Sequence, residues 1–583
     1  MKSSEGFVRM RTLQGVVLFI FLLIAGRLAY IQLVDSKYNE LAKANVLRHV
    51  VQYPPRGEVF DRNGEYLVQS RECYDLMVIY SEIDKHGFDT VRMCDVLGLS
   101  RGKLEKELAN ARMRPRAPRV VTSYISKEDK LRFDECNFRG FYAVYRTVRR
   151  YPRKVGGNLL GFVGEVNADF LKRHPDYKSG DYVGMSGVES AYEPLLKGKK
   201  GVKIQEIDTH GAIKGSYMNG VYDSLPEPGK YIVSTIDARL QLLGEELMRG
   251  KVGAAVAIEP STGEILMMVS SPTYDPDELV GRERGNNYMK MLGNKRQPLY
   301  NRAVRAKYPP GSTFKLATML TLLDDADMSP QTAYDTHNGD PVTVGPAKNI
   351  RDSHRGDHVI DFRRAVASSS NVYFAKAIWE RYGITGKKQE YSDFLHEKLH
   401  LGKTVGLERL GERAPSITAD WKVPDPGVML VKMSYGYRVR LAPIQMITFY
   451  NAIANGGKMI SPVLIRELRR GDRVEERFES RTLASSICSR AALREVQRCL
   501  ELVCTQGTAS LYFKDSTRLR VAAKTGTAQI TDARSREGRY YLGSMIAYFP
   551  ADNPRYTVLT TIETRAQAGK AYYGGPLAGP VVK

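Results

Sequence analysis

The chain has 583 residues, which is more than one hydrophobic core usually holds, so its length predicts two to four domains. Its composition, 43% hydrophobic and 26% charged, is typical of a folded protein and excludes a disordered one. The net charge of +22 is spread along the chain without a separate basic arm, and no nucleic-acid-binding motif is present. The charge therefore favours a basic surface near anionic lipid or polymer over a nucleic-acid partner.

Residues 12–34, TLQGVVLFIFLLIAGRLAYIQLV, form an apolar segment long enough to cross a bilayer, which needs about 20 residues. Its internal charge, Arg27, can reach the interface. Lys2, Arg9 and Arg11 precede it and predict a cytoplasmic tail at residues 1–11, with the rest of the chain exported. The alternative is a cleaved signal peptide. The long apolar run and the lack of a small-x-small cleavage site favour an uncleaved anchor.

A boundary falls near residue 229, where Pro226, Pro228 and Gly229 interrupt the pattern. Before it, Asn63-Gly64 predicts a hairpin turn. Residues 100–150 predict amphipathic helices among many basic residues, and GMSGVESAYEPLLKGKKG (184–201) predicts a helix bounded by glycines. We expect one domain over residues 35–228 and a second over residues 229–583.

The second region begins and ends with strand patterns. Residues 231–236 read as a strand, and 254–260 with 264–271 read as a hairpin around Ser261-Thr262-Gly263. Helical patterns dominate residues 312–455, and strand patterns return at 521–530, 540–549 and 555–563. Strands at both ends with helices between them predict an α/β domain whose sheet joins distant segments. The six cysteines contain no C-x-x-C pair, so most are expected to be small buried residues.

Ser312 begins the apolar stretch GSTFKLATMLTLL after a Pro-Pro-Gly turn, and Lys315 follows three residues later. The stretch is apolar on nearly all sides, which predicts a buried helix with Ser312 in its first turn, on the same face as Lys315. A lysine whose pKa is lowered by burial or a nearby cation can take the proton of a serine nucleophile. The spacing alone says little, because Ser100 and Lys103 share it in a polar context.

Two further motifs follow. Ser369-Ser370-Asn371 lies between two apolar helical stretches and predicts a turn whose hydroxyl and amide face a cleft. Lys524-Thr525-Gly526-Thr527 ends a strand of small residues, where a cation and a hydroxyl could bind a carboxylate. Each could also be purely structural, a helix cap or an edge strand, and Lys178-Ser179-Gly180 is a similar tripeptide in a polar loop.

The three motifs in this order are the signature of penicillin-recognising serine enzymes. Along nearly its whole length the chain resembles the class B penicillin-binding proteins. This resemblance rests on the anchor and on six segments: RGEVFDRNG, GMSGVESAYEPLLKG, EPSTGEILMMVSSP, YPPGSTFK, SSN and KTGT. It implies a transmembrane helix, an elongated mixed α+β pedestal domain of the dimerisation type, and a transpeptidase domain with a mainly antiparallel sheet flanked by helices.

The resemblance also implies a mechanism. Ser312 would attack the carbonyl between two D-alanines, with Lys315 as base, kept neutral in part by Lys524. Ser369 would pass a proton to the departing amine, and Asn371 would hold the substrate amide and orient Lys315. Lys524 and Thr525, with Gly526 and Thr527 beside them on the strand, would bind the terminal carboxylate. The N–H groups of Ser312 and Thr527 would form the oxyanion hole. No metal or other cofactor is expected, and HRGDH (354–358) lacks a metal-ligand spacing.

Residues 433–462 resemble the division-specific septal transpeptidase, with the elongation-specific enzyme as the alternative. The implied partners are peptidoglycan stem peptides, the lipid-linked precursor product, β-lactams as covalent inhibitors, a membrane-embedded glycosyltransferase and division or elongation proteins. The implied location is the inner membrane, with the catalytic domain outside. Two departures stand out: Arg438 replaces a usual glycine, and the chain stops at GPLAGPVVK, before the terminal helix expected of the family.

Four other functions are alternatives. A β-lactamase would be smaller and soluble, and the class A kind needs an E-x-x-L-N stretch that is absent between SSN and KTG. A β-lactam sensor usually has several spans, and a scaffold would not need both Lys315 and Lys524. A D,D-carboxypeptidase differs only in using water as the acceptor, so the motifs leave it open.

Overall fold

The structure is a computed structural model that describes residues 2–33, 46–84, 88–207, 213–417, 420–515, 519–531, 538–567 and 572–583. The chain divides into two compact units. The first contains residues 1–55, 72–147 and 198–228, and the second contains residues 56–71, 148–197 and 229–583. The chain enters the second unit for the last time at Gly229. The domain limits at 35–228 and 229–583 remain predictions.

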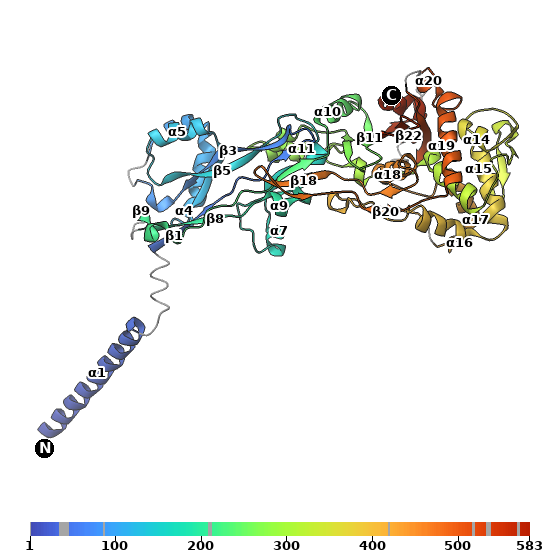
Figure 1. Cartoon of the computed structure of the whole chain (residues 1–583). Helices are drawn as coiled ribbons and strands as arrows, with labels where there is room; N and C mark the ends of the chain where they lie inside the picture. The colour runs from blue at the N-terminus through green and yellow to red at the C-terminus, as the bar shows by residue number, and fades with distance from the viewer. Residues whose placement is uncertain are drawn as a thin grey trace. The chain divides into compact units, whose positions relative to one another are not determined.

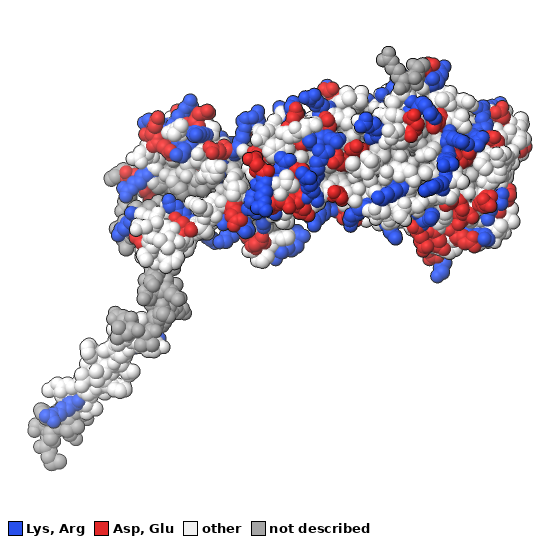
Figure 2. Space-filling model, in the orientation of Figure 1, with Lys and Arg blue, Asp and Glu red and all other residues white. Residues whose placement is uncertain are grey.

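The apolar N-terminal segment forms one long helix, α1 (Lys2–Leu33). Within it, Met10–Ile31 has a mean hydropathy of 2.0, and no other helix in the described ranges is long and apolar enough to cross a membrane. Figure 2 shows the described side chains of α1 as largely uncharged, whereas basic and acidic side chains are interspersed over the visible face of the rest. The helix has the composition expected of a single-pass anchor, and residue 34 of the predicted span lies outside the described residues.

The first unit contains two small layers. β1 (Leu47–Gln52) pairs antiparallel with β8 (Gly201–Ile207), which pairs with β9 (Ile213–Ser216). Separately, the end of β3 (Tyr66–Val78) pairs with β4 (Arg119–Ile125), and β5 (Phe141–Arg150) also pairs with β3. Buried side chains join these strands to α3 (Thr90–Leu97), α4 (Arg101–Arg112) and α5 (Lys127–Glu135).

The helical prediction for residues 100–150 was therefore wrong at β4 and β5. Their sequences, RVVTSYI and FYAVYRTVRR, are rich in β-branched and aromatic residues, which favour strands, and the basic residues obscured this pattern. The helix predicted at 184–201 is likewise broken into α8 (Gly187–Ala191) and α9 (Glu193–Leu196), because Pro194 cannot continue a helix and instead starts a new one.

The segment 56–71 belongs to the second unit and is built around the predicted hairpin. β2 (Val59–Phe60) pairs antiparallel with the start of β3 and parallel with β10 (Tyr231–Ser234). Gly64 has φ +86° in the turn between them, a conformation that glycine adopts without strain. Asp61 closes this turn, since its Oδ1 accepts from the N–H groups of Asn63 (2.7 Å) and Glu65 (2.8 Å).

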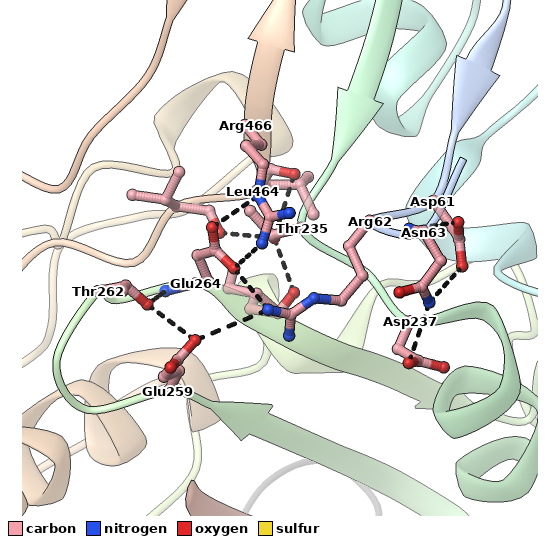
Figure 3. Close-up of polar contacts among 12 residues, drawn as sticks. Asp61, Arg62, Asn63, Thr235, Asp237, Glu259, Thr262, Glu264, Leu464 and Arg466 are labelled. Atoms are coloured by element: carbon pink, nitrogen blue, oxygen red, sulfur yellow. Dashed lines mark hydrogen bonds and ion pairs between the residues drawn. The ribbon is translucent and has the colours of Figure 1, made fainter. Parts of the chain in front are cut away.

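Figure 3 shows how this segment contacts the rest of the second unit. The Arg62 guanidinium lies 3.1 Å from Glu264 Oε2 and 3.8 Å from Glu259 Oε2. Glu264 also accepts two hydrogen bonds from Arg466, at 2.8 and 2.6 Å. The neighbouring Asn63 donates to Asp237 Oδ2 at 3.3 Å. The hairpin is thus held by carboxylates from two later parts of the chain, Asp237 and the turn that carries Glu259 and Glu264.

A buried ionic cluster fixes the start of the same segment. Arg56 donates through Nε to Glu189 Oε2 (2.7 Å) and through Nη2 to Glu193 Oε2. Arg149 Nε lies 2.7 Å from the other oxygen of Glu189, which is completely buried. Each charge needs its partners because an unpaired buried ion is strongly destabilising.

The core of the second unit is a five-stranded antiparallel sheet in the order β12 (Ile265–Ser271), β11 (Val252–Ile258), β23 (Tyr556–Arg565), β22 (Tyr540–Phe549) and β21 (Ala522–Ile530). This confirms the predicted sheet that joins distant segments. One face packs on α18 (Pro443–Ala454), and the other packs on α10 (Ala238–Leu247) and α21 (Gly574–Val582). α18 also contacts β22, and α19 (Arg490–Thr505) packs on the edge strand β21; Figure 1 shows these helices in the same part of the second unit as β22.

Helices cover residues 311–455 only in part. α14 (Phe362–Ser368) and α15 (Asn371–Ile378) follow two small antiparallel strand pairs. β13 (Tyr334–Asp335) pairs with β16 (Val359–Ile360), and the hairpin of β14 (Val342–Val344) and β15 (Ala347–Ile350) lies between them in the chain. The other elements are α6 (Gly157–Leu160), α7 (Ala168–Arg173), α11 (Arg284–Leu292), α12 (Arg302–Arg305), α13 (Lys315–Leu320), α16 (Lys388–Asp393), α17 (Pro426–Met433), α20 (Ser510–Phe513), β6 (Val163–Glu165), β7 (Tyr182–Gly184), β17 (Met459–Ile460), β18 (Ile465–Arg470), β19 (Arg473–Arg477) and β20 (Thr482–Ala484).

Candidate active site

Ser312 lies at the start of a buried helix, as predicted. A 3₁₀ turn, η4 (Gly311–Phe314), leads into α13, and every side chain of α13 is buried. Ser312 itself is partly exposed. Its position at the first turn leaves backbone N–H groups free of intrahelical partners, which favours negative charge at this point.

Glycine at position 311 lets the helix start approach strand β21 closely. Gly311 has φ +56°, and a Cβ atom there would lie 2.7 Å from the backbone oxygen of Thr527. A Cβ on Gly526 of the same strand would likewise lie 2.9 Å from Thr313 Cγ2. Both glycines are therefore required for Ser312 and the Lys524–Thr527 strand to share one site.

Lys315 is completely buried beneath Ser312, and its ammonium group contacts the second motif. Its Nζ donates to the backbone oxygen of Ser369 (2.6 Å) and to Asn371 Oδ1 (2.8 Å), and it lies 3.3 Å from Ser369 Oγ. Burial lowers the pKa of Lys315 to about 7, while the negative charge of Asp352 acts in the opposite direction. A large fraction of Lys315 is thus neutral at neutral pH and able to accept a proton.

Lys524 contacts the same serine from the opposite side. It is completely buried, and its Nζ lies 2.7 Å from Ser369 Oγ. Burial and the neighbouring Lys315 hold the pKa of Lys524 well below its usual value. The expectation was that Lys524 would help to keep Lys315 neutral and remain charged itself. Burial disfavours charge on both lysines. A bound carboxylate would favour the charged form of Lys524.

The Ser369 backbone is in the left-handed region, with φ +59°. Ser369 ends α14, and Ser370 caps α15 by accepting from the Tyr373 N–H at 3.1 Å. This is the predicted turn between two apolar helices. A non-glycine residue in this conformation costs on the order of 1 kcal/mol and persists only when its surroundings hold it there.

The motifs meet at one cavity of about 830 Å³. Ser312, Ser369, Asn371 and the Thr525–Thr527 segment line it, and Lys315 and Lys524 lie buried beside it. The structure thus brings together all eight residues that the motifs singled out. Neither of the two similar motifs elsewhere in the chain joins them. Ser100 caps α4 by accepting from the Lys103 N–H, and Lys178 and Ser179 lie exposed in a polar turn.

The cavity also has walls that the motifs did not indicate. Thr508 Oγ1 lies 2.6 Å from Thr525 Oγ1 and so fixes the hydroxyl of the strand motif. Tyr541 stacks on Tyr572, with ring centroids 4.4 Å apart, and both line the cavity together with Asp352. These residues carry no local signal, because their place depends on how distant segments pack. In the described ranges, no group of three or more His, Cys, Asp or Glu side chains is arranged to hold a metal ion.

The fold and the site define a serine acyltransferase of the penicillin-recognising type: a serine at a buried helix start, a second serine contacted by two buried lysines, and a strand hydroxyl at the sheet edge. Comparison with protein-family models gives the same class. Residues 253–583 match the penicillin-binding protein transpeptidase domain, and residues 51–234 match the penicillin-binding protein dimerisation domain. The chain therefore belongs to the class B penicillin-binding proteins and is a serine-type D-Ala-D-Ala transpeptidase.

Curated relatives of this chain carry several names. Stage V sporulation protein D of Bacillus subtilis is 26% identical over 100% of this chain and 85% of its own length. Peptidoglycan D,D-transpeptidase MrdA of Haemophilus influenzae is 26% identical over 100% of this chain and 92% of its own length. Peptidoglycan D,D-transpeptidase FtsI of Buchnera aphidicola is 24% identical over 99% of this chain and 92% of its own length. The similar identities agree on the class of enzyme and do not select one of these names.

Proposed function

We propose that this protein cross-links peptidoglycan stem peptides through an acyl-enzyme on Ser312. The observation that carries the proposal is the contact of Ser369 Oγ with both buried lysines, at 2.7 Å from Lys524 and 3.3 Å from Lys315, beside the cavity that Ser312 lines. Such an arrangement can move a proton between a nucleophile and a leaving group while one lysine remains available for an anion.

In the first step, Ser312 Oγ bonds to the carbonyl carbon of the penultimate D-alanine, and the C–N bond to the terminal D-alanine breaks. Neutral Lys315 takes the serine proton and gives it to Ser369, whose Oγ lies 3.3 Å from Nζ, while Ser369 passes its own proton to the departing amine. Asn371, which accepts from Lys315 at 2.8 Å, orients that lysine and holds the substrate amide. In the apo site Ser312 Oγ is not among the hydrogen-bond partners of Lys315, and such contacts often form only with substrate.

Lys524 and Thr525 bind the terminal carboxylate, with Gly526 and Thr527 continuing the strand beside the substrate. The N–H groups of Ser312 and Thr527 stabilise the oxyanion, at about 3 kcal/mol for each donor. In the second step, an amine of a neighbouring stem peptide attacks the ester carbonyl, and Ser312 leaves with a proton. β-Lactams resemble the D-Ala-D-Ala end and leave Ser312 acylated.

For the cellular role we propose septal wall synthesis during division, on the resemblance of residues 433–462, with elongation as the alternative. The proposed partners are the lipid-linked precursor product, a membrane-embedded glycosyltransferase and other division proteins. We propose further that α1 is a single-pass anchor of the inner membrane with its N-terminus inside, which places the catalytic unit outside. Depletion with microscopy separates the two roles: filaments would support division, and round cells would support elongation.

The acylation test uses the full chain in detergent with a fluorescent penicillin. We expect a long-lived covalent adduct on the wild type and none on Ser312→Ala. Ser100→Ala is the matched control, because Ser100 has the same S-x-x-K spacing but caps an exposed helix. An adduct on Ser312→Ala at the wild-type rate would overturn the assignment. Incubation with a donor stem peptide, with and without an added amine, distinguishes the transpeptidase from the D,D-carboxypeptidase that releases the acyl group to water.

A further inference from the structure

Asp352, in the loop between β15 and β16, uses both carboxylate oxygens on the turn that carries the second motif. Its Oδ2 accepts from Ser370 Oγ at 2.7 Å, and its Oδ1 accepts from the N–H groups of Asn371 and Val372, at 2.9 Å for Val372. The backbone N–H of Asp352 donates to Gly339 O at 3.2 Å, which anchors the loop. One carboxylate thus binds the two residues that follow Ser369 and the first N–H groups of α15.

The preceding residue completes the clamp. The backbone oxygen of Arg351 accepts from Asn371 Nδ2 at 2.9 Å, so the side-chain amide of Asn371 can point only its oxygen at Lys315 Nζ, 2.8 Å away. A flipped amide would place an NH₂ group against the ammonium group and lose both hydrogen bonds. The loop therefore sets which atom of Asn371 faces the lysine.

The turn needs such support, because Ser369 is held at φ +59° immediately before Ser370. We propose that Asp352 is a positioning residue for acyl transfer: its carboxylate holds the turn that carries Ser369 and Asn371, and its charge acts on the buried Lys315. The proposal rests on the proposed function, in that Lys315 is taken as the base. Asp352 acts through these groups and is not itself assigned contact with substrate.

The charges around Lys315 determine the sign of the effect. Two charged side chains lie near Lys315: Lys524, which belongs to β21, and Asp352, which belongs to the loop between β15 and β16. The groups that bind Lys315 directly, from Ser369 and Asn371, are neutral. The charge of Asp352 raises the pKa of Lys315 against the larger effect of burial. Removing that charge should lower the pKa of Lys315, so that the neutral base persists to lower pH.

The test compares the acylation rates of the wild type and Asp352→Asn between pH 5.5 and 9 with fluorescent penicillin. Asparagine keeps the shape and can still accept from the backbone N–H groups of the turn. We expect the rising limb of the rate profile to move to lower pH by about half a unit or more. The ratio of variant to wild-type rate would then be about threefold larger at pH 6 than at pH 9.

Two further variants separate charge from structure. Ser370→Ala removes one contact of the clamp without changing charge, so we expect a lower plateau rate and an unmoved limb. Asp340→Asn removes a charge from an exposed aspartate 3.2 Å from Arg355, outside the clamp, and should leave both features unchanged. An unmoved limb in a folded Asp352→Asn protein, with the wild type acylating normally, would overturn this inference alone. If Asp352→Asn does not fold, a normal plateau for Ser370→Ala would overturn the positioning role. Failure of the wild type to acylate would instead refute the proposed function.

Discussion

The close approach of Gly311 to strand β21 gives a prediction whose size can be worked from the structure. In Gly311→Ala the new Cβ atom would lie 2.7 Å from Thr527 O, whereas ordinary contact begins near 3.4 Å. The helix start and the strand must therefore separate by about 0.7 Å. Because a misplacement of 1 Å can cost about 100-fold in rate, we expect acylation to slow by at least tenfold.

Gly456→Ala is the matched control for this substitution. Gly456 also has a left-handed backbone, φ +67°, but a Cβ atom there would meet nothing within 4 Å. It should show only the backbone strain, about 1 kcal/mol in the free energy of unfolding, with an unchanged acylation rate. The measurements are thermal or urea unfolding and the rate of labelling by fluorescent penicillin at saturating pH. If both variants acylate at the wild-type rate, the fit of Gly311 against Thr527 does not position Ser312.

Three other predictions follow from the charges and the backbone. The pKa of Lys315 is lowered to about 7, and its neutral amine is the proposed base. The wild-type acylation rate should therefore be half-maximal near pH 7 and fall about tenfold per unit below pH 6. A flat stopped-flow profile from pH 5.5 to 9 would exclude Lys315 as the base. Glu189→Gln should lower the free energy of unfolding by about 3–5 kcal/mol at pH 7, because it removes the carboxylate that Arg149 contacts and leaves the buried Arg56 with Glu193 alone. The exposed Glu246→Gln should change this free energy by less than about 0.5 kcal/mol. Burial acts to raise the pKa of Glu189, but the two arginines outweigh burial, and the pKa is lowered from 4.5. The stabilisation by ionised Glu189 is therefore present above pH 4.5 and is lost as the pH falls through the lowered pKa. Urea unfolding at pH 7 and pH 3.5 should show a smaller difference between variant and wild type in acid. Arg438→Gly should leave the protein as stable or up to about 1 kcal/mol more stable, since Arg438 is exposed at φ +63°, and a loss of more than 1 kcal/mol would show that its side chain contributes contacts that outweigh the strain.

The parts of the fold that the sequence predicted were those with a strong local pattern. The Asn63-Gly64 turn, the hairpin of β11 and β12, and the buried helix after Ser312 each follow from turn residues or an unbroken apolar run. β4 and β5 were missed because basic residues interrupt their alternation. The strand pairs between residues 334 and 360 were missed because each of their strands has only two to four residues, too few to show a period.

For the candidate site, the eight predicted residues lie within short motifs, so they could be read from their spacing and order. Asp352, Thr508 and Tyr572 could not, since each acquires its role from a contact with a residue 17 or more positions away. At Arg438 the sequence shows an unusual residue but does not reveal the backbone conformation. The sequence marked it as a departure from a usual glycine, and the structure shows that its backbone keeps the glycine-like conformation with φ +63°.

The strand order of the central sheet also determines when the site can form during synthesis of the chain. β11 ends at Ile258, yet its neighbour on one side is β23, which starts at Tyr556, with Gly253 opposite Ile562. A growing chain therefore carries Ser312, the proposed nucleophile, for more than 240 further residues before the strand that completes the sheet has been made. Until then β11 and β22 each expose an unpaired edge, and Lys524 has no finished sheet to hold it under Ser369. Penicillin labelling of chains stopped at different lengths would thus report completion of the sheet, and reactivity would begin only once β23 is in place.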